Sequence, residues 1–248
     1  MKHFTYTFLF LTIFACDQNN AWDCIQTSGP LVIEELTLVP FEKILVNRDI
    51  SLTIKQGTDY KVDIETGENL MGDIEISVVG KQLQLSDNNR CNLVRDYGLT
   101  KMTVTTPYLN EIRSSTQYLT TSEGILNFEN LNLISENYNS DFISSGDFNL
   151  SVNSQTLSII ANNLSVFRIS GSTDSLSVEF FEGVCEFKGD NLIAEHINIF
   201  QRSSHDMLLN PQQSLEGEIR STGNVISVHT PAVVNVEQFY TGQLLFLD

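Results

Sequence analysis

Residues 157–178 read Leu-Ser-Ile-Ile-Ala-Asn-Asn-Leu-Ser-Val-Phe-Arg-Ile-Ser-Gly-Ser-Thr-Asp-Ser-Leu-Ser-Val, and this stretch decides the fold. Apolar residues alternate with serine in 157–159, 164–166 and 176–178. Successive side chains of a β-strand point to opposite faces, so the alternation predicts short strands with one apolar and one polar face. Helical periodicity is almost absent beyond residue 30.

The pattern recurs along the chain at a nearly constant interval. One interval runs from Leu157 to Leu176, and the next runs from Leu176 to Ile197. A short phrase also recurs at 112–115, 143–146, 169–172 and 219–223, in which an isoleucine is followed by serine, threonine or glycine, with an arginine between them in the first and last cases. A period of about 20 residues without helices indicates a solenoid, whose stacked coils share one core. We therefore predict an all-β fold, a parallel β-helix of short strands. A β-sandwich is the alternative, because it shows similar alternation.

The part of the chain before these repeats has the same strand-like texture. Alternating apolar pairs are bounded by Gly57, Gly67, Gly72 and Gly80. Glycine at such positions lets the backbone turn sharply between strands. We assign residues 30–248 to one β-helix domain.

The beginning of the chain, residues 1–16, has the form of a bacterial secretion signal. Lys2 is basic, residues 4–14 are mostly apolar, and Ala15-Cys16 forms a cleavage point. This predicts that residues 1–15 are a lipoprotein-type signal peptide and that Cys16 is lipidated. Residues 16–29 would be a lipid-anchored polar tether. The protein would then belong to the cell envelope, at the outer membrane, and the sequence does not distinguish its periplasmic from its surface-facing side. The lipid would be its only membrane contact. An ordinary signal peptide cleaved after Ala15 is the alternative.

The charge of the chain restricts its partners. With 14 basic and 31 acidic residues, the net charge is −17. Such a charge disfavours nucleic acid and anionic lipid surfaces as partners, because both repel an acidic protein.

The remaining cysteines fit an oxidising compartment. Cys24 and Cys91 lie in polar, turn-like surroundings, where such a compartment favours their pairing. The disulfide would close a loop of about 67 residues and contribute about 4 kcal/mol. Cys185 shares a strand face with Phe187, which predicts a buried free thiol. The sequence has no Cys-x-x-Cys pair, so neither a metal nor a cofactor is predicted.

A row of basic residues is the candidate ligand-facing site. The sequence has no Gly-x-Ser-x-Gly, no His-Glu-x-x-His and no Gly-rich phosphate loop, so no catalytic residue is assigned. Arg168 and Lys188 are separated by one period of the repeat, and stacked coils would make them neighbours. Arg202 and Arg220 would extend the row toward an anionic glycan.

Two further groups of residues leave alternatives open. Carboxylates gathered on one coil face would suit a polysaccharide lyase or hydrolase; these are Asp141, Asp147, Asp174, Asp190 and Asp206. Aromatic rings could provide platforms on which sugars stack; these are Tyr138, Phe180, Phe181, Phe200, Phe239 and Tyr240.

Several motifs before the repeats point to a known family. They are Phe41-x-x-Ile44-x-Val46, Ile50-x-Leu52-x-Ile54-x-x-Gly57 and the strand passage 102–115. Over residues 38–240 the chain resembles the bacterial putative autotransporter adhesin, head GIN domain family. The resemblance implies a right-handed β-helix, a location outside the cytoplasm and an adhesive role, and it carries no catalytic residues. Ser114-Ser115-Thr116 stands where the family commonly has a glycine, so this corner is expected to differ.

The sequence thus predicts a non-catalytic cell-envelope lipoprotein, an adhesion or ligand-binding module that presents a polar β-helix face. A glycan or an envelope surface protein is the expected partner. A polysaccharide-active enzyme and a structural envelope protein are the alternatives.

Overall fold

The computed structural model describes residues 23–89, 92–136 and 144–247, and in these ranges the fold is all-β. The only helices in the described ranges are two short 3-10 turns, η2 (Asp23–Ile25) and η3 (Glu68–Asp73). No helix in the described part of the chain has the length and apolar character needed to span a bilayer.

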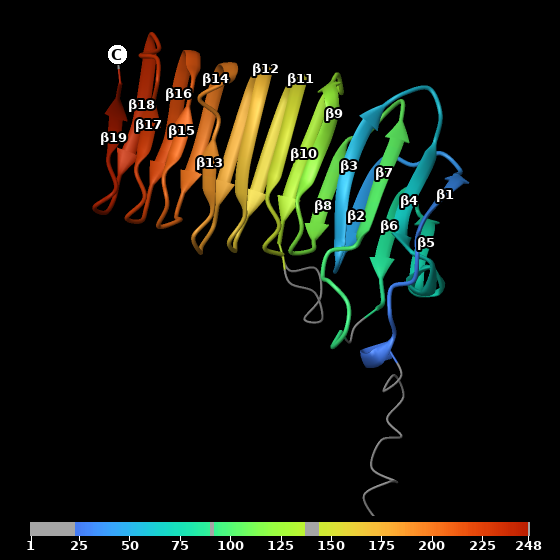
Figure 1. Cartoon of the computed structure of the whole chain (residues 1–248). Coiled ribbons are helices and arrows are strands. Elements are labelled where there is room, and N and C mark those ends of the chain that lie inside the picture. Colours follow the sequence, from blue (N-terminus) through green and yellow to red (C-terminus); the bar gives the residue numbers. More distant parts are fainter. Residues whose placement is uncertain (1–22, 90–91, 137–143, 248) are drawn as a thin grey trace, which may run out of the picture.

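The strands form one continuous curled sheet (Figure 1). In chain order the first ten are β1 (Leu31–Thr37), β2 (Lys43–Asn47), β3 (Ile50–Gln56), β4 (Lys61–Gly67), β5 (Ile74–Val79), β6 (Gln82–Asp87), β7 (Thr100–Thr106), β8 (Glu111–Ser115), β9 (Thr120–Leu126) and β10 (Asn130–Ser135). The others are β11 (Phe148–Ala161), β12 (Val166–Phe180), β13 (Glu186–Lys188), β14 (Leu192–Gln201), β15 (Met207–Leu209), β16 (Pro211–Ile219), β17 (Val225–Ser227), β18 (Val233–Gln238) and β19 (Leu244–Phe246).

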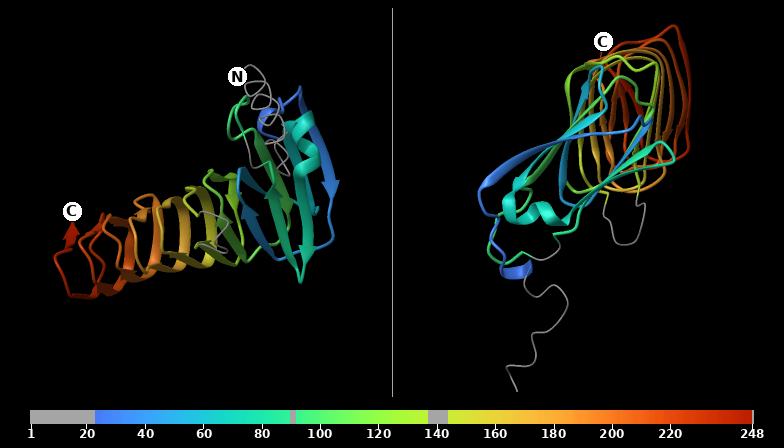
Figure 2. Two further views of the ribbon diagram at one scale, coloured as in Figure 1. Left: turned by 90° about the horizontal axis from the view of Figure 1, so that it is seen from below. Right: turned by 90° about the vertical axis from the view of Figure 1, so that its right-hand side faces the viewer.

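From β8 onward the chain winds in stacked coils whose neighbouring strands are parallel. The predicted neighbours meet, because Leu157 pairs with Leu176 and Leu176 pairs with Ile197. On a second side of the coils, Phe148 pairs with Phe167 and Phe167 with Phe187. The end-on view in Figure 2 shows successive turns of chain superimposed on one another. This parallel pairing does not match the antiparallel β-sandwich.

The N-terminal part departs from the predicted uniform solenoid. Strand β4 is antiparallel to both β1 and β7, and β5 is antiparallel to β6. The β5–β6 hairpin turns at Gly80 and Lys81, which have φ of 54° and 65°. Two successive positive φ values are those of a type I′ turn, which joins antiparallel strands with the correct twist. The assignment of residues 30–248 to parallel coils throughout is therefore wrong for this part, which is a mixed sheet.

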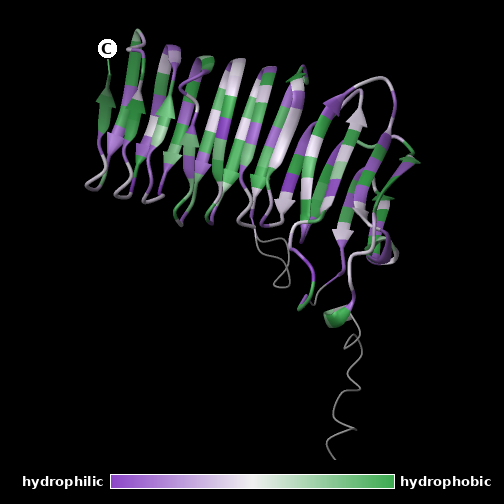
Figure 3. Cartoon of the chain, in the orientation of Figure 1, coloured by the Kyte–Doolittle hydropathy of each residue, from purple (hydrophilic) through white to green (hydrophobic). Residues whose placement is uncertain are grey.

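The coils enclose an apolar core and carry polar rows outside. The rings of Phe148 and Phe167 stack at 4.8 Å between centroids with a 9° interplanar angle. Outside, the Ser151 and Ser170 hydroxyls are 3.0 Å apart, and Ser172 Oγ donates to Asn153 Oδ1 at 3.0 Å. Each coil therefore pairs with its neighbour through the core, the backbone ladder and the outer side chains (Figure 3).

Cys185 is part of a coil corner. It is fully buried and free, as the sequence predicts. Its Sγ accepts the backbone N–H of Asn163 at 3.3 Å, and its carbonyl accepts the hydroxyl of Ser203 at 2.7 Å. Burial raises the pKa of the Cys185 thiol, which keeps it in the unreactive protonated form.

Neighbouring coils approach each other closely at Gly217. It has a φ of 126°, and a Cβ there would lie 2.0 Å from the carbonyl oxygen of Ile199 on the preceding coil. We expect Gly217→Ala to lower the free energy of unfolding by about 2 kcal/mol or more, through backbone strain and overlap. Denaturant titration measures this. Gly72→Ala is the matched control, because a Cβ there meets nothing within 4 Å. Equal effects of the two substitutions would contradict the close approach.

Candidate ligand-binding face

The structure divides the predicted basic row into two pairs. Arg168 and Lys188 are direct partners on β12 and β13. The next partner of Lys188 is Leu208 on β15 and not Arg202. Arg202 and Arg220 instead follow the paired residues Gln201 and Ile219 at the ends of β14 and β16. Their backbone N–H groups donate to Phe180 O and Gln201 O on the preceding coils, at 2.9 and 2.7 Å.

The first pair lines an open pocket on the outside of the coils. The pocket measures about 260 Å³, and its lining residues are Asn149, Arg168, Ile169, Ser170, Lys188, Asp190 and Asn191. Backbone hydrogen bonds fix the turn after β13, because Gly189 N–H donates to Leu208 O at 2.9 Å and Leu192 N–H donates to Gly189 O at 3.0 Å. The pocket therefore offers amides, a hydroxyl and charges of both signs on a fixed backbone.

Each cation of this pocket has a carboxylate partner. Arg168 Nη1 lies 2.8 Å from Asp147 Oδ2, and Lys188 Nζ lies 3.3 Å from Glu186 Oε2. Both cationic side chains remain about two-fifths exposed, at 43% and 39%. Exposed ion pairs contribute at most about 1 kcal/mol. An anionic group of a ligand can therefore replace these carboxylates as the partner of either cation at a small cost in free energy.

Of the second pair, Arg220 belongs to a ladder of aromatic rings. The Arg220 guanidinium lies over the Phe239 ring at 4.2 Å and near the Phe200 ring at 5.9 Å. Phe200 in turn packs against Phe181 with centroids 5.4 Å apart. The ion pair of Arg220 with Glu218 raises the pKa of Arg220. This stack was missed from sequence, although the same period that predicts the coils also relates Phe181, Phe200, Arg220 and Phe239.

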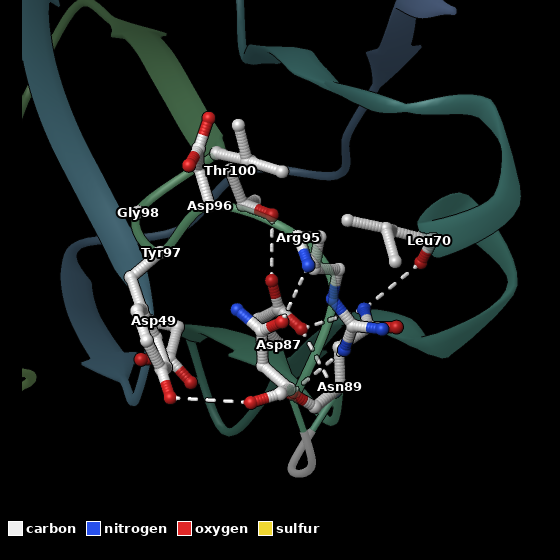
Figure 4. A pocket seen from close by; sticks show the side chains of 11 residues that line it. Asp49, Leu70, Asp87, Asn89, Arg95, Asp96, Tyr97, Gly98 and Thr100 are labelled. Carbon is white, nitrogen blue, oxygen red and sulfur yellow. Dashed lines mark hydrogen bonds between the residues drawn. The ribbon is translucent and has the colours of Figure 1, made fainter. Parts of the chain in front are cut away.

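A second pocket lies in the N-terminal part, beside the loop before β7 (Figure 4). Asp87 is its buried centre. The Asp87 carboxylate accepts hydrogen bonds from the Asn89 backbone and side chain, at 2.9 and 2.7 Å, and from Thr100 Oγ1 at 2.6 Å. The pocket measures only about 40 Å³. Its polar groups bond mainly to one another, so this cluster fastens the loop to the sheet.

The described residues include no group of three or more His, Cys, Asp or Glu side chains placed to hold a metal ion. Two of the histidines make structural contacts. His196 Nδ1 lies 3.0 Å from Ser214 Oγ, and His229 Nδ1 lies 2.8 Å from the carbonyl oxygen of Pro211.

Several predicted residues lie outside the described ranges. These are the signal peptide 1–15, Cys16, Cys91, Tyr138 and Asp141. Cys24 takes part in a disulfide, and Leu93 N–H donates to Cys24 O at 2.9 Å. The pairing of Cys24 with Cys91 stays a prediction. Of the predicted tether, residues 26–29 contact η3, because Gln26 Nε2 donates to Asn69 O at 2.6 Å and Asn69 Nδ2 donates to Thr27 O at 2.9 Å.

The family model for the "putative auto-transporter adhesin, head GIN domain" matches residues 40–231. The chain belongs to this family. The match confirms the resemblance that the strand motifs indicate, over nearly the same residues.

Solved structures of the same fold come from Bacteroides and Parabacteroides species. A putative adhesin from Bacteroides fragilis has a TM-score of 0.80 at 19% identity, over 90% of this chain and 100% of that chain. A putative adhesin from Parabacteroides merdae has a TM-score of 0.65 at 13% identity, over 89% and 97%. A protein described as a putative lipid binding protein, from Parabacteroides distasonis, has a TM-score of 0.62 at 14% identity, over 89% and 98%. No curated protein matches the chain. At these identities the likeness establishes the fold alone.

The carboxyl group of Asp49 makes the free energy of unfolding depend on pH. Burial raises the pKa of Asp49 above its ordinary value of 3.8, and a hydrogen bond from Gln117 opposes the rise. The native state therefore binds this proton more tightly than the unfolded state, and the free energy of unfolding falls as pH rises above 3.8. We expect Asp49→Asn, which keeps an acceptor for Gln117, to add up to about 1 kcal/mol at pH 7.

The gain should vanish at about pH 3, where Asp49 is protonated in both states. Thermal unfolding at the two pH values measures this, with the exposed Asp59→Asn as control. A gain that persists unchanged at about pH 3 would show that charge burial is not its cause.

Proposed function

We propose that this chain is a lipid-anchored, non-catalytic protein of the cell envelope that works as an adhesion or ligand-binding module. One observation carries the proposal: Arg168 and Lys188 lie side by side in a pocket whose other polar groups are amides, a hydroxyl and Asp190. Family membership supports an adhesive role.

We further propose that the coils from β8 to β19 form a right-handed parallel β-helix. The parallel registers support this, because β11, β12, β14, β16 and β18 pair in sequence without an antiparallel partner. A stack of this kind holds its outer side chains on a rigid frame. Little conformational freedom is then lost when a ligand binds, which favours affinity from modest contacts.

We propose a glycan as the ligand. Asn149, Ser170 and Asn191 supply neutral donors and acceptors for hydroxyl groups, and the two cations suit a carboxylate or sulfate on the sugar. An envelope surface protein is the other candidate partner. Asp190 beside Lys188 favours a second candidate function, a polysaccharide-active enzyme, because acid–base cleavage needs a carboxylate near a basic group.

The pocket can be tested by loss of binding. The full chain is screened against neutral and anionic polysaccharides, with retention and shortened products both recorded. We expect retention without products. Arg168→Ala combined with Lys188→Ala should weaken retention about tenfold or more, because hydrogen bonds to charged groups contribute about 1.5–3 kcal/mol.

The matched control for the pocket is Lys55→Ala. Lys55 on β3 is a similarly exposed lysine, paired with Glu123 on β9 and remote in sequence from the pocket, and its loss should leave retention unchanged. Shortened products would favour the enzyme. Equal retention by the double variant and the parent chain would remove the pocket from the binding site.

Lipid anchoring is tested at Cys16. We expect the parent chain to partition with membranes and Cys16→Ala to be released, because acyl chains hold the chain there. Fractionation and metabolic labelling with a fatty acid measure this. Cys185→Ala is the control, since that thiol is buried in a coil corner. Membrane retention and label that survive Cys16→Ala would contradict the anchor.

A further inference from the structure

Four exposed apolar side chains gather where the described chain begins. We call Ile25, Leu93, Val94 and Tyr97 the basal tip; their exposed fractions are 54%, 76%, 54% and 74%. They come from η2 and from the loop before β7, two segments far apart in sequence. In Figure 3 the apolar end of this loop lies beside the apolar η2, at the base of the mixed sheet.

Hydrogen bonds hold the two segments of the basal tip together. Besides the bond from Leu93 N–H to Cys24 O, Arg95 Nη1 donates to Gln26 O at 3.2 Å. Within the loop, Arg95 N–H donates to Asn92 Oδ1 at 2.9 Å, and Tyr97 Oη donates to Asn92 O at 3.3 Å. These hydrogen bonds hold the loop in place. Its apolar side chains are exposed, while Arg95 donates to the backbone of Gln26.

The position of the basal tip restricts what can cover it. Cys16 lies shortly before Cys24 in the chain, with residues 17–23 between them, and the eight steps from one cysteine to the other span at most about 28 Å when extended. A lipid on Cys16 therefore keeps the basal tip close to a bilayer surface; this step rests on the proposed anchoring. Leucine, isoleucine and valine side chains partition into the boundary of the acyl chains, and tyrosine is enriched at the headgroup level.

We propose that the basal tip inserts into the interfacial region of a phospholipid bilayer, as a second contact beside the lipid anchor. The chain's net charge of −17 favours zwitterionic over anionic headgroups. Two contacts hold the mixed sheet against the membrane. The coils then have a fixed orientation relative to the bilayer, which a single flexible tether would not impose.

The test places a single tryptophan in the basal tip. Trp22 is the only tryptophan of the chain, so Trp22→Phe gives a silent background. Val94→Trp then reports on the basal tip, and Val233→Trp reports on β18, at the other end of the sheet, at a similar exposure of 51%. The lipidated full chains are reconstituted in phosphatidylcholine vesicles with brominated acyl chains, and vesicle flotation is recorded with fluorescence.

We expect Val94→Trp to be quenched at least twofold and shifted to the blue, and Val233→Trp to be unaffected. Flotation without quenching at residue 94, or equal quenching at both positions, overturns the insertion and leaves the anchor intact. A blue shift at residue 94 without bromine quenching indicates protein contact and also overturns it. Failure of the parent chain to float overturns the anchor, and the placement of the basal tip at a membrane with it.

Discussion

Parallel hydrogen bonding between successive coils is the constraint on which the rest of the structure depends. Once Leu157 is paired with Leu176, nearly every residue along β11 and β12 has a fixed neighbour, inside and outside the coil. The buried Phe148–Phe167 stack and the outer serine and asparagine contacts follow from that register, and the Arg168–Lys188 pair follows from the register of β12 with β13. None of these contacts is strong alone, and their regular repetition on one backbone ladder stabilises the assembly.

The sequence predicts the strand neighbours from β8 onward well, because residues one interval apart, such as Leu157 and Leu176, are paired. It predicts the N-terminal part poorly, since alternation alone does not distinguish parallel from antiparallel partners. The Gly80-Lys81 hairpin contained a local signal, a glycine between two alternating runs, that was recognised only as a strand boundary. In the site, equal spacing predicted the Arg168–Lys188 pair. The corner between Gln201 and Met207 then places Leu208, and not Arg202, beside Lys188.

The two pairs of basic residues differ in chemical character. Arg168 and Lys188 hold exchangeable carboxylate partners in an open pocket, which suits reversible contact with a polar ligand. Arg220 is 41% exposed, lies over the Phe239 ring and pairs with Glu218, so its contacts join the last coils to one another. The proposed binding role of Arg168 and the packing contacts of Arg220 thus depend on the surrounding side chains and not on the residue type.

The mixed sheet and the last coil terminate the stack in different ways. At the N-terminal end, within the mixed sheet, β4 pairs antiparallel with β7 and β5 pairs antiparallel with β6. At the other end, among the described residues, β18 pairs only with β16 and β19 only with β17. One coil is therefore a modular unit of length: adding or removing one moves the last coil by about 4.8 Å and leaves the other pairings in place. Relatives can in this way acquire stacks of different length without redesigning their core.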